Sequence, residues 1–401
     1  MTIDLQALPL KMAPPRCLRK GRWIALALLS GLLGSGLVFL LWPGDGSRGS
    51  PWFWCCALVL PLMPGVLLFA FRLLAYERQQ AFAISWNKAL ETQEHMLVQY
   101  GQRAAALLAT AYCTPAGNAR LAQAILGGSK PLQPVYQQKS GRTMRLSRLV
   151  PPVQNGPEQP YAERLKPFLQ QVKQNIQQDL LTGCTTPLRL RIKHNQIIAD
   201  AEVLDLWHSC VVDGFQVDAV EFAQDDGLFW LESWLDESEP YGFLLSLEIN
   251  LLLEPIEEQA ESVSALLVAH PHHAMAPNLV PKAWIHRPVS MTDHARSVQD
   301  LLLWGRISES NHALPAWQAQ LASDEICAAN ILLARAGHPL APEQSIRLDD
   351  SFGRPGSAVA NIALVVASEQ AASTGEPQLI MLEDVSSQWC VVSPPYEERK
   401  E

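Results

Sequence analysis

The stretch that decides the fold is Gly353-Arg-Pro-Gly-Ser-Ala-Val-Ala-Asn-Ile-Ala-Leu-Val-Val-Ala-Ser-Glu-Gln-Ala-Ala372. Glycine and proline at its start indicate a turn, and the run that follows is rich in Ala, Val and Ile. A helix that is apolar on nearly every side is buried on every side. We therefore predict a helix over Ser357–Ala372 that is enclosed between two sheets.

The segments around this helix alternate between strand and helix patterns. Strands are predicted at Leu188–Ile192, Gln216–Phe222, Phe243–Leu252, Val263–Ala269, Gln378–Glu383 and Trp389–Ser393, and helices at Lys166–Leu181, Asp200–Cys210, Gly227–Asp236 and Asp293–Trp304. Near-continuous apolar strands are typical of a sheet that is covered on both faces. The fold class is therefore α/β, with a loop expected over Lys130–Pro160 and a connection between two halves over His270–Val289.

Two uncharged runs near the N-terminus, Trp23–Trp42 and Trp52–Phe71, are each long enough to cross a bilayer. At 1.5 Å per residue each run reaches about 30 Å, the thickness of the hydrocarbon core. Tryptophans stand at the run ends, and Gly31, Gly34 and Gly36 allow close helix packing. We expect a transmembrane hairpin in contact with lipid from Trp23 to Phe71, kinked at Pro61 and Pro64.

Positive charges favour one orientation of this hairpin. Lys and Arg flank both spans on one side, at Lys11, Arg16, Arg19, Lys20, Arg22, Arg72 and Arg78. The loop Pro43–Pro51 has only Arg48, which Asp45 offsets. The positive-inside rule then places both termini in the cytoplasm, with a short loop outside. Such short termini and loop are typical of a bacterial protein, so we expect a multi-pass protein of the inner membrane. The predicted organisation is a cytoplasmic tail (1–22), the hairpin (23–75), a juxtamembrane helix (76–102) and a cytoplasmic domain (103–395).

Charge and cysteine content exclude several classes. A net charge of −9 argues against nucleic-acid binding. The eight cysteines form no CxxC pair, and no cofactor motif is present, so neither a metal nor a cofactor is expected. The cluster His270-Pro-His-His273, with His286 and His294 beyond it, lacks a carboxylate or thiolate at ligand spacing and is interpreted as a surface loop. The acidic runs Asp225–Gly227 and Asp236–Glu239 are interpreted as solvated edges.

Two motifs resemble the β-ketoacyl synthases of the thiolase-like superfamily. Ala106-Leu-Leu-Ala-Thr-Ala-Tyr-Cys-Thr-Pro-Ala-Gly-Asn118 is similar to that family's first strand and turn, with Asn118 expected to cap the next helix and Gly127 and Gly128 to end it. Asp350-Ser-Phe-Gly-Arg-Pro-Gly-Ser-Ala-Val-Ala-Asn361 resembles its glycine-rich turn. The resemblance implies a layered αβαβα domain with two similar halves, about 103–270 and 290–395.

The departures from the family concern its chemistry. Its members use a thiolate at a helix N-terminus and two histidines. Phe352 and Arg354 stand where the glycine-rich turn would supply a histidine, and no "HGTGT"-like segment occurs. Cys210, with His208 beside it, is the nearest candidate nucleophile, although their spacing places them on different helix faces. We interpret the domain as catalytically inactive.

The leading hypothesis is a membrane-anchored scaffold or adaptor that recruits a protein partner, for example as a type VI secretion component. The resemblance also implies a dimer interface. One alternative is a membrane-bound acyl-transfer enzyme that uses Cys210 and His208. A second alternative is a non-catalytic partner subunit of a true ketosynthase, similar to a chain-length factor.

Overall fold

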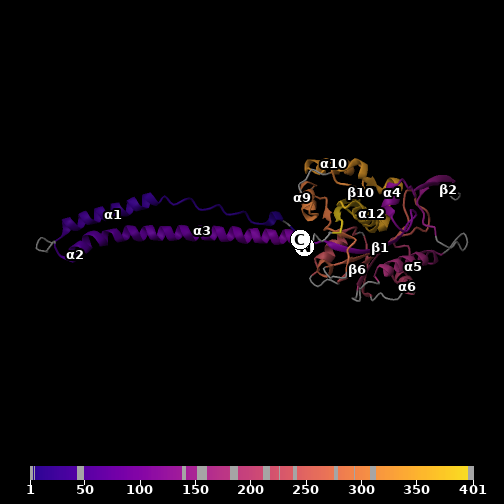
Figure 1. Cartoon of the computed structure of the whole chain (residues 1–401), viewed down its shortest axis with the longest axis horizontal. Coiled ribbons are helices and arrows are strands. Elements are labelled where there is room, and N and C mark those ends of the chain that lie inside the picture. The colour runs from indigo at the N-terminus through magenta and orange to yellow at the C-terminus, as the bar shows by residue number, and fades with distance from the viewer. Residues whose placement is uncertain are drawn as a thin grey trace. The chain divides into compact units, whose positions relative to one another are not determined.

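The computed structural model describes residues 3, 5–42, 49–137, 141–150, 160–180, 188–210, 217–224, 226–237, 242–274, 279–292, 294–307 and 313–395. The chain divides into two compact units (Figure 1). The N-terminal helical unit ends at Leu97, and the α/β unit begins at Val98.

Two long helices dominate the N-terminal helical unit. The first is α1 (Lys20–Leu41), preceded by the 3-10 turn η1 (Leu5–Ala7). The second runs without interruption through α2 (Pro51–Trp54), the π-helical turn η2 (Cys55–Val59) and α3 (Leu60–Gly101). Both are long and apolar enough to cross a membrane. The predicted juxtamembrane helix is therefore not a separate element, since no helix-ending residue interrupts α3 after Phe71.

Small residues let α1 and α3 approach closely. A Cβ atom on Gly34 would lie 2.3 Å from Pro61, and one on Gly65 would lie 2.7 Å from the Ala27 backbone. Pro61 lacks an N–H, and the Ser35 hydroxyl donates a hydrogen bond to the carbonyl oxygen of Ala57, four residues before that proline. The disturbance near the prolines is thus a π-helical turn whose backbone is partly satisfied by the neighbouring helix.

The N-terminal segment lies along the part of α3 that follows the apolar run. The backbone of Met12 and the side-chain amide of Asn87 exchange two hydrogen bonds, at 2.8 and 3.0 Å. Lys11 pairs with Glu91 at 3.2 Å. Residues before the first span and after the second are therefore in contact, as expected for a hairpin with both ends on one side.

The α/β unit contains one large mixed sheet and a separate two-stranded hairpin. The large sheet is formed by β1 (Ala105–Cys113), β4 (Leu188–His194), β5 (Val217–Ala223), β6 (Phe243–Asn250), β7 (Ser262–Ala269), β8 (Ala283–Ile285), β9 (Val289–Ser290), β10 (Ala316–Ala319), β11 (Ile346–Arg347), β12 (Gln378–Glu383) and β13 (Ser387–Ser393). Its order is β11-β10-β12-β13-β8-β1-β7-β6-β4-β5, with β9 beside β13.

The two halves of this sheet repeat one topology. The first half has the order β5-β4-β6-β7-β1 and the second the order β11-β10-β12-β13-β8. If the five strands of each half are numbered along the chain, both orders read third, second, fourth, fifth, first. In each half the fifth strand, β7 or β13, is antiparallel to both neighbours, and the second strand is parallel to both of its own. The predicted pair of similar halves is confirmed. They are joined into one sheet rather than separated, because β1 pairs with β8.

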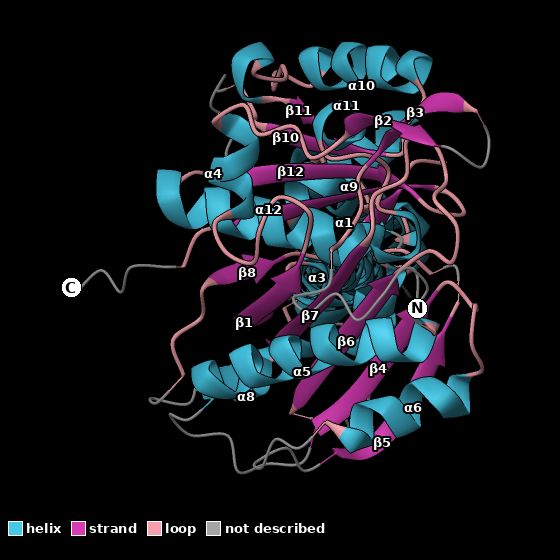
Figure 2. Cartoon of the chain, turned by 90° about the vertical axis from the view of Figure 1, so that its right-hand side faces the viewer, coloured by secondary structure: helices cyan, strands magenta, loops and turns pink. Residues whose placement is uncertain are grey.

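Helices cover and divide this sheet in layers (Figure 2). On the outer face of the first half lie α5 (Tyr161–Leu180) and α6 (Asp200–Ser209), and on that of the second half α9 (His294–Trp304) and α10 (Ser323–Arg335). Between the halves lie α4 (Leu121–Leu126), α7 (Phe229–Leu235) and α12 (Val359–Thr374). The short helices α8 (Pro271–Ala274), η3 (Pro342–Gln344), α11 (Leu348–Ser351) and η4 (Gly356–Ala358) lie in connections.

The helix predicted from Ser357–Ala372 is the centre of the core. Every residue of α12 from Val359 to Ser368 is buried, and the helix contacts strands of both halves. Its residues, together with apolar residues of β1, β7, β12 and β13, form one core cluster. The prediction that this helix has no solvent-facing stripe is confirmed over that stretch. The prediction of two separate sheets around it is wrong, because the strands on both sides belong to one sheet.

Several local predictions were wrong. Lys130–Pro160 is not one loop, because β2 (Gln133–Gln137) and β3 (Arg142–Leu146) pair within it. Asn118 does not cap α4; the N-cap residue is Arg120, in a left-handed conformation. The first turns of α4 are instead satisfied by the Tyr112 hydroxyl and the Glu369 carboxylate, which sequence spacing does not reveal. Helix α5 begins at Tyr161 rather than Lys166.

Candidate functional site

The candidate site lies between the N-termini of two central helices. In the first half α7 follows the third strand, β5, and in the second half α12 follows the third strand, β11. The two helices are therefore counterparts, although α7 has 7 residues and α12 has 16. Both begin near the carboxyl ends of parallel strands, the edge where α/β proteins bind ligands.

Strand β4 supplies the cations of this site. Leu188, Leu190 and Ile192 face the cluster formed with α5 and α6, so the alternating residues Arg189, Arg191 and Lys193 face the centre. Arg191 and Lys193 are only 1% and 2% exposed. Buried cations require paired anions, and those anions come from three other segments of the chain.

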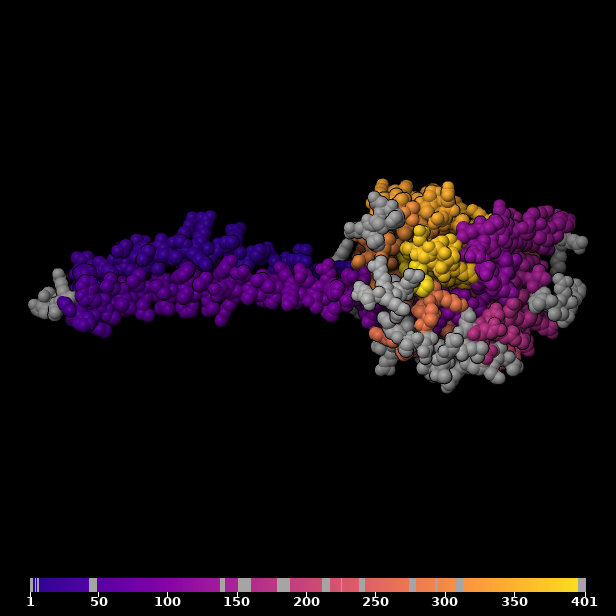
Figure 3. Space-filling view, viewed as in Figure 1, coloured from indigo at the N-terminus to yellow at the C-terminus, as the bar shows by residue number. Residues whose placement is uncertain are grey.

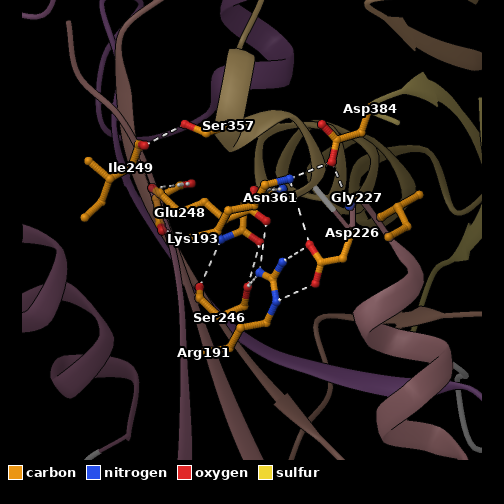
Figure 4. A network of polar contacts seen from close by, with 12 residues as sticks. Arg191, Lys193, Asp226, Gly227, Ser246, Glu248, Ile249, Ser357, Asn361 and Asp384 are labelled. Carbon is orange, nitrogen blue, oxygen red and sulfur yellow. Dashed lines mark hydrogen bonds and ion pairs between the residues drawn. The ribbon is translucent and has the colours of Figure 1, made fainter. Parts of the chain in front are cut away.

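Arg191 is the hub of the resulting network (Figure 4). Its guanidinium donates to both carboxylate oxygens of Asp226, to the Ser246 hydroxyl at 3.0 Å and to Glu248 at 3.1 Å. It also lies over the ring of Trp230, 5.3 Å from the ring centre. Asp226 lies three residues before the start of α7, and Ser246 and Glu248 belong to β6, so the network joins the beginning of α7 to the sheet.

The N-terminus of α7 is closed by side chains of the second half. Asp384 accepts hydrogen bonds from the backbone N–H of Gly227, at 2.8 Å, and from the Lys193 ammonium, at 2.6 Å. The Gln388 side chain accepts one from the N–H of Leu228 at 2.6 Å. Gly227 has a φ of 51°, and a Cβ there would lie 2.4 Å from Gln388, so only glycine fits this approach.

The N-terminus of α12 is closed in the same manner. Glu248, which has no exposed surface, accepts a hydrogen bond from the N–H of Asn361 at 2.8 Å. The Asn361 side chain donates to the carbonyl oxygens of Ser246 and Ser264 and accepts from the Ser246 hydroxyl. The protein's own side chains thus occupy the N–H groups of the two residues directly before α7 and the N–H of Asn361, the third residue of α12, where an anionic ligand or oxyanion would look for backbone donors.

Burial governs the ionisation of the innermost carboxyl. It raises the pKa of Glu248, while the nearby charges of Arg191 and Lys193 act in the opposite direction. A carboxyl that is both paired and hydrogen-bonded to a backbone N–H has little freedom to act as a general base. The arrangement is that of a structural ion network.

A pocket of about 370 Å³ lies beside this network, between β5 and α7. Its volume is within the range of small-molecule sites. Two arginines line it, but Arg189 is paired with Glu237 at 2.5 Å and Arg191 with Asp226. These charges compensate each other within the protein.

The structure separates Cys210 and His208 rather than bringing them together. Cys210 caps the C-terminus of α6 and is 2% exposed, whereas the side chain of His208 is exposed. The Cys210 thiol lies 3.2 Å from the Leu206 carbonyl oxygen, and burial raises its pKa, against the opposing charges of Lys173 and Lys166. A buried thiol at the C-terminal end of a helix is poorly suited to form a thiolate.

The glycine-rich turn keeps its backbone but not a reactive side chain. Gly353 has a φ of 99°, and a Cβ there would lie 3.1 Å from the Glu258 carbonyl oxygen. Phe352 is fully buried in the central core. Arg354 points outward, with a side chain 56% exposed and 4.0 Å from Asp349.

Two predicted surface features are in part buried. His270 is 1% exposed and lies 5.5 Å from the Trp234 ring, so the histidine cluster is not simply a surface loop. Asp226 and Asp236 are not solvated edges either, because they pair with the buried residues Arg191 and Arg287. Asp225, Ser238 and Glu239 lie outside the described residues.

Within the described ranges no group of three or more His, Cys, Asp and Glu is arranged to hold a metal ion.

The central network was missed by sequence reasoning, although a signal for it exists. The run Leu188-Arg-Leu-Arg-Ile-Lys-His194 alternates apolar and basic residues. Alternation of this kind normally indicates a strand with one solvated face. Since strands of this sheet are covered on both faces, the basic side had to be buried against acids such as Asp226, Glu248 and Asp384.

No protein-family model matches the sequence, and no curated protein matches it significantly. Among solved structures, a β-ketoacyl synthase from Burkholderia phymatum STM815 is similar with a TM-score of 0.51 at 10% identity, covering 74% of this chain and 100% of that chain. The α/β unit has a thiolase-like fold. This confirms the predicted fold class, and at 10% identity the likeness concerns the fold alone.

Two further structures are less similar to this thiolase-like unit. The ishigamide ketosynthase/chain length factor has a TM-score of 0.48 at 14% identity, covering 73% of this chain and 100% of that chain. The 3-oxoacyl-[acyl-carrier-protein] synthase III from Aquifex aeolicus VF5 has a TM-score of 0.42 at 12% identity, with the same coverage.

Proposed function

We propose that this protein is a catalytically inactive, ketosynthase-like scaffold anchored in the bacterial inner membrane. One observation carries the proposal: side chains of the chain itself close the N-termini of both central helices. Asp384 and Gln388 bind the N–H groups of Gly227 and Leu228, directly before α7, and Glu248 binds that of Asn361, the third residue of α12. An acyl-transfer enzyme needs a nucleophile and free oxyanion donors at such a place.

The same network supports a structural role. It ties β6 of the first half to α12 through Glu248 and Asn361, and β4 to the turn after β12 through Lys193 and Asp384. A scaffold benefits from two halves locked in one arrangement, because a rigid surface loses less entropy on binding. Recruitment of a protein partner to a membrane-bound secretion machine, such as type VI secretion, fits this combination of anchor and rigid domain. The implied homodimer belongs to this proposal as well.

The proposal is tested by acylation. The purified full chain, in detergent micelles, is incubated with acyl-coenzyme A and acylated carrier protein and then weighed by intact-mass spectrometry. We expect no acyl adduct, on the wild type or on Cys210→Ser. An adduct on the wild type that disappears in Cys210→Ser would instead establish the acyl-transfer alternative.

The membrane assignment has its own test. In a variant whose native cysteines are all replaced by serine, single cysteines are introduced at Gly49, between the two helices, and at Lys88, beyond the second span. In intact cells an impermeant maleimide should label only the first position, as expected if the loop is outside and both termini are cytoplasmic. Labelling at Lys88 alone would reverse the orientation. Deleting 23–71 should release the protein into the soluble fraction.

A further inference from the structure

The hairpin β2–β3 is an exposed feature that the scaffold proposal does not use. Four of the five residues of β2 are exposed, including Val135 (42%) and Tyr136 (64%). Among the described strands, β2 pairs with β3 alone. Figure 3 shows this region standing out from the surface at the upper right. The N–H of Leu132, directly before β2, is bonded to the carbonyl oxygen of Ser351 at 3.0 Å, but no described strand pairs with the outer edge of β2 itself.

The hairpin is held firmly from the side of β3. Met144 and Leu146 are buried, and the carbonyl oxygen of Arg145 accepts a hydrogen bond from the N–H of Glu258 at 2.9 Å. The backbone bridge between Ser147 and Ala260 continues this contact. A hairpin fixed on one side presents a pre-organised edge on the other.

The geometry identifies which groups this edge offers. A proline in a strand is confined to positions where its nitrogen faces away from the neighbouring strand. Pro134 therefore faces outward, and Tyr136, two residues on, faces outward as well. The edge then offers the N–H of Tyr136 and the carbonyl oxygens of Pro134 and Tyr136.

The chain segment that forms the hairpin has a charge opposite to that of the whole protein, although Glu258 lies beside it and pairs with Arg145 of β3 at 3.5 Å. The chain has a net charge of −9, yet it contains no Asp or Glu from His95 to Pro157. Lys130 lies just before β2, and Arg142 lies opposite Gln137 at the other end of that strand. Both side chains are exposed, as is that of Arg148. None of the three forms an ion pair with a described residue.

The hairpin lies away from the point where the long helix enters the α/β unit. Gly101, at the end of α3, packs so closely on Trp304 of α9 that a Cβ would lie 2.1 Å from the ring. Figure 1 shows β2 at the opposite end of the α/β unit from α9.

We propose that the outer edge of β2 binds an extended, acidic segment of a partner protein by strand addition. Backbone groups of Pro134 and Tyr136 would pair with the partner strand, and Lys130 and Arg142 would meet its carboxylates. Only a polypeptide can complete the backbone pairing, which favours a protein over a lipid or nucleic acid. This inference rests on the proposed scaffold function and names the chemistry of the partner.

The test measures binding of a labelled peptide to the full chain in detergent micelles. The probe is a fluorescein-labelled octapeptide of alternating Glu and Val, and its counterpart has Lys in place of Glu. We expect the acidic peptide to bind and the basic one not to bind. Lys130→Glu/Arg142→Glu should weaken binding at least tenfold, whereas the matched reversal Arg335→Glu, at an exposed position of α10, should change it less than twofold.

A second arm separates strand addition from simple charge attraction. Tyr136→Pro removes the outward N–H and keeps the charges, so binding should fall at least tenfold. In the wild type the peptide should slow amide hydrogen exchange within 133–137, a readout that does not depend on how well any variant folds. Unchanged exchange there, or equal binding of both peptides, would overturn the proposal. Tighter binding to anionic phospholipid vesicles or to single-stranded DNA than to the acidic peptide would overturn it too.

The two proposals fail separately. If the acidic peptide does not bind, the acylation test of the scaffold proposal still stands. If an acyl adduct forms on Cys210, the peptide-binding measurement at the hairpin still stands.

Discussion

Replacing Arg191 by Met would remove the only described cation that directly contacts the buried Glu248 carboxylate. Arg191 has a side chain 2% exposed, and Glu248 has none of its surface exposed. Methionine replaces the aliphatic part of the arginine side chain but cannot satisfy either Glu248 or Asp226. Asp226 is 27% exposed and can recover hydration, whereas Glu248 cannot. The cost of the substitution is therefore concentrated on one carboxyl group.

The magnitude follows from this burial. Removing one partner of a buried ion pair typically costs about 3–5 kcal/mol, because an uncompensated charge remains inside. Part of this penalty is relieved if Glu248 takes up a proton. Its pKa is already raised by burial, and loss of Arg191 removes a charge that lowers it. We therefore expect the free energy of unfolding at pH 8 to fall by about 3–4 kcal/mol.

The sign of the pH dependence is a sharper test than the magnitude. In the variant, Glu248 in the folded state has a pKa above its unfolded value of 4.5. The folded state then binds more protons than the unfolded state, so stability is lost as pH rises through the folded pKa. The difference between variant and wild type should consequently shrink when the pH is lowered from 8 towards 5.

The assay is urea unfolding of the full chain in detergent micelles, followed by tryptophan fluorescence. Arg189→Met is the matched control, since Arg189 lies on the same face of β4 but is 21% exposed. It should cost about 1 kcal/mol or less. Adding Glu248→Gln to Arg191→Met should restore at least half of the loss, because the amide oxygen can still accept from Asn361. An Arg191→Met variant as stable as the wild type at every pH would refute a closed, dry network.

Three other predictions concern groups elsewhere in the α/β unit and the tail. Cys17 and Cys327 are exposed and should react rapidly with a maleimide, while Cys210 should react only after unfolding, as mass mapping of labelled peptides will show. Burial lowers the pKa of His286 to about 4, so its contribution to stability is present above pH 6.5 and is lost as pH falls towards 4, by up to about 3 kcal/mol. In His286→Gln the free energy of unfolding, measured with urea, should depend less on pH between 6.5 and 4. An unchanged pH dependence would contradict the assignment. Ala363→Leu should lower the free energy of unfolding by about 1–3 kcal/mol through overpacking, whereas Ala372→Leu, at the exposed end of α12, should be close to neutral.

Local patterns identified most of the secondary structure. The strand Gln378–Glu383 has the predicted bounds, and Asp200–Cys210 and Phe243–Leu252 differ from α6 and β6 by one and two residues. These segments carry a strong apolar period that neighbouring residues alone specify. The hairpin β2–β3 was missed because its strands are short and largely exposed, so they lack the buried face that creates such a period.

For the candidate site, some features could be predicted from the sequence and others only from the structure. The absence of a histidine at Phe352–Arg354 and the bulky surroundings of Cys210 are visible in the sequence, since they depend on residue type at a motif. The sequence does not show which charged residues pair with each other. Arg191 and Asp226 are 35 residues apart, and Lys193 and Asp384 are 191 apart. No periodicity relates such positions, so acids destined for the core looked like ordinary solvated residues.

The sequence by itself determined the apolar hairpin, the α/β class and the wholly buried helix Ser357–Ala372. Each of these follows from the composition and period of a continuous stretch, which decides burial wherever that stretch lies. Only the tertiary structure decided that the two halves share one sheet through β1 and β8, and that Asp384 and Glu248 close the central helices. The physical reason is that buried charges are placed by partners distant in sequence, and only folding brings those partners within hydrogen-bonding distance.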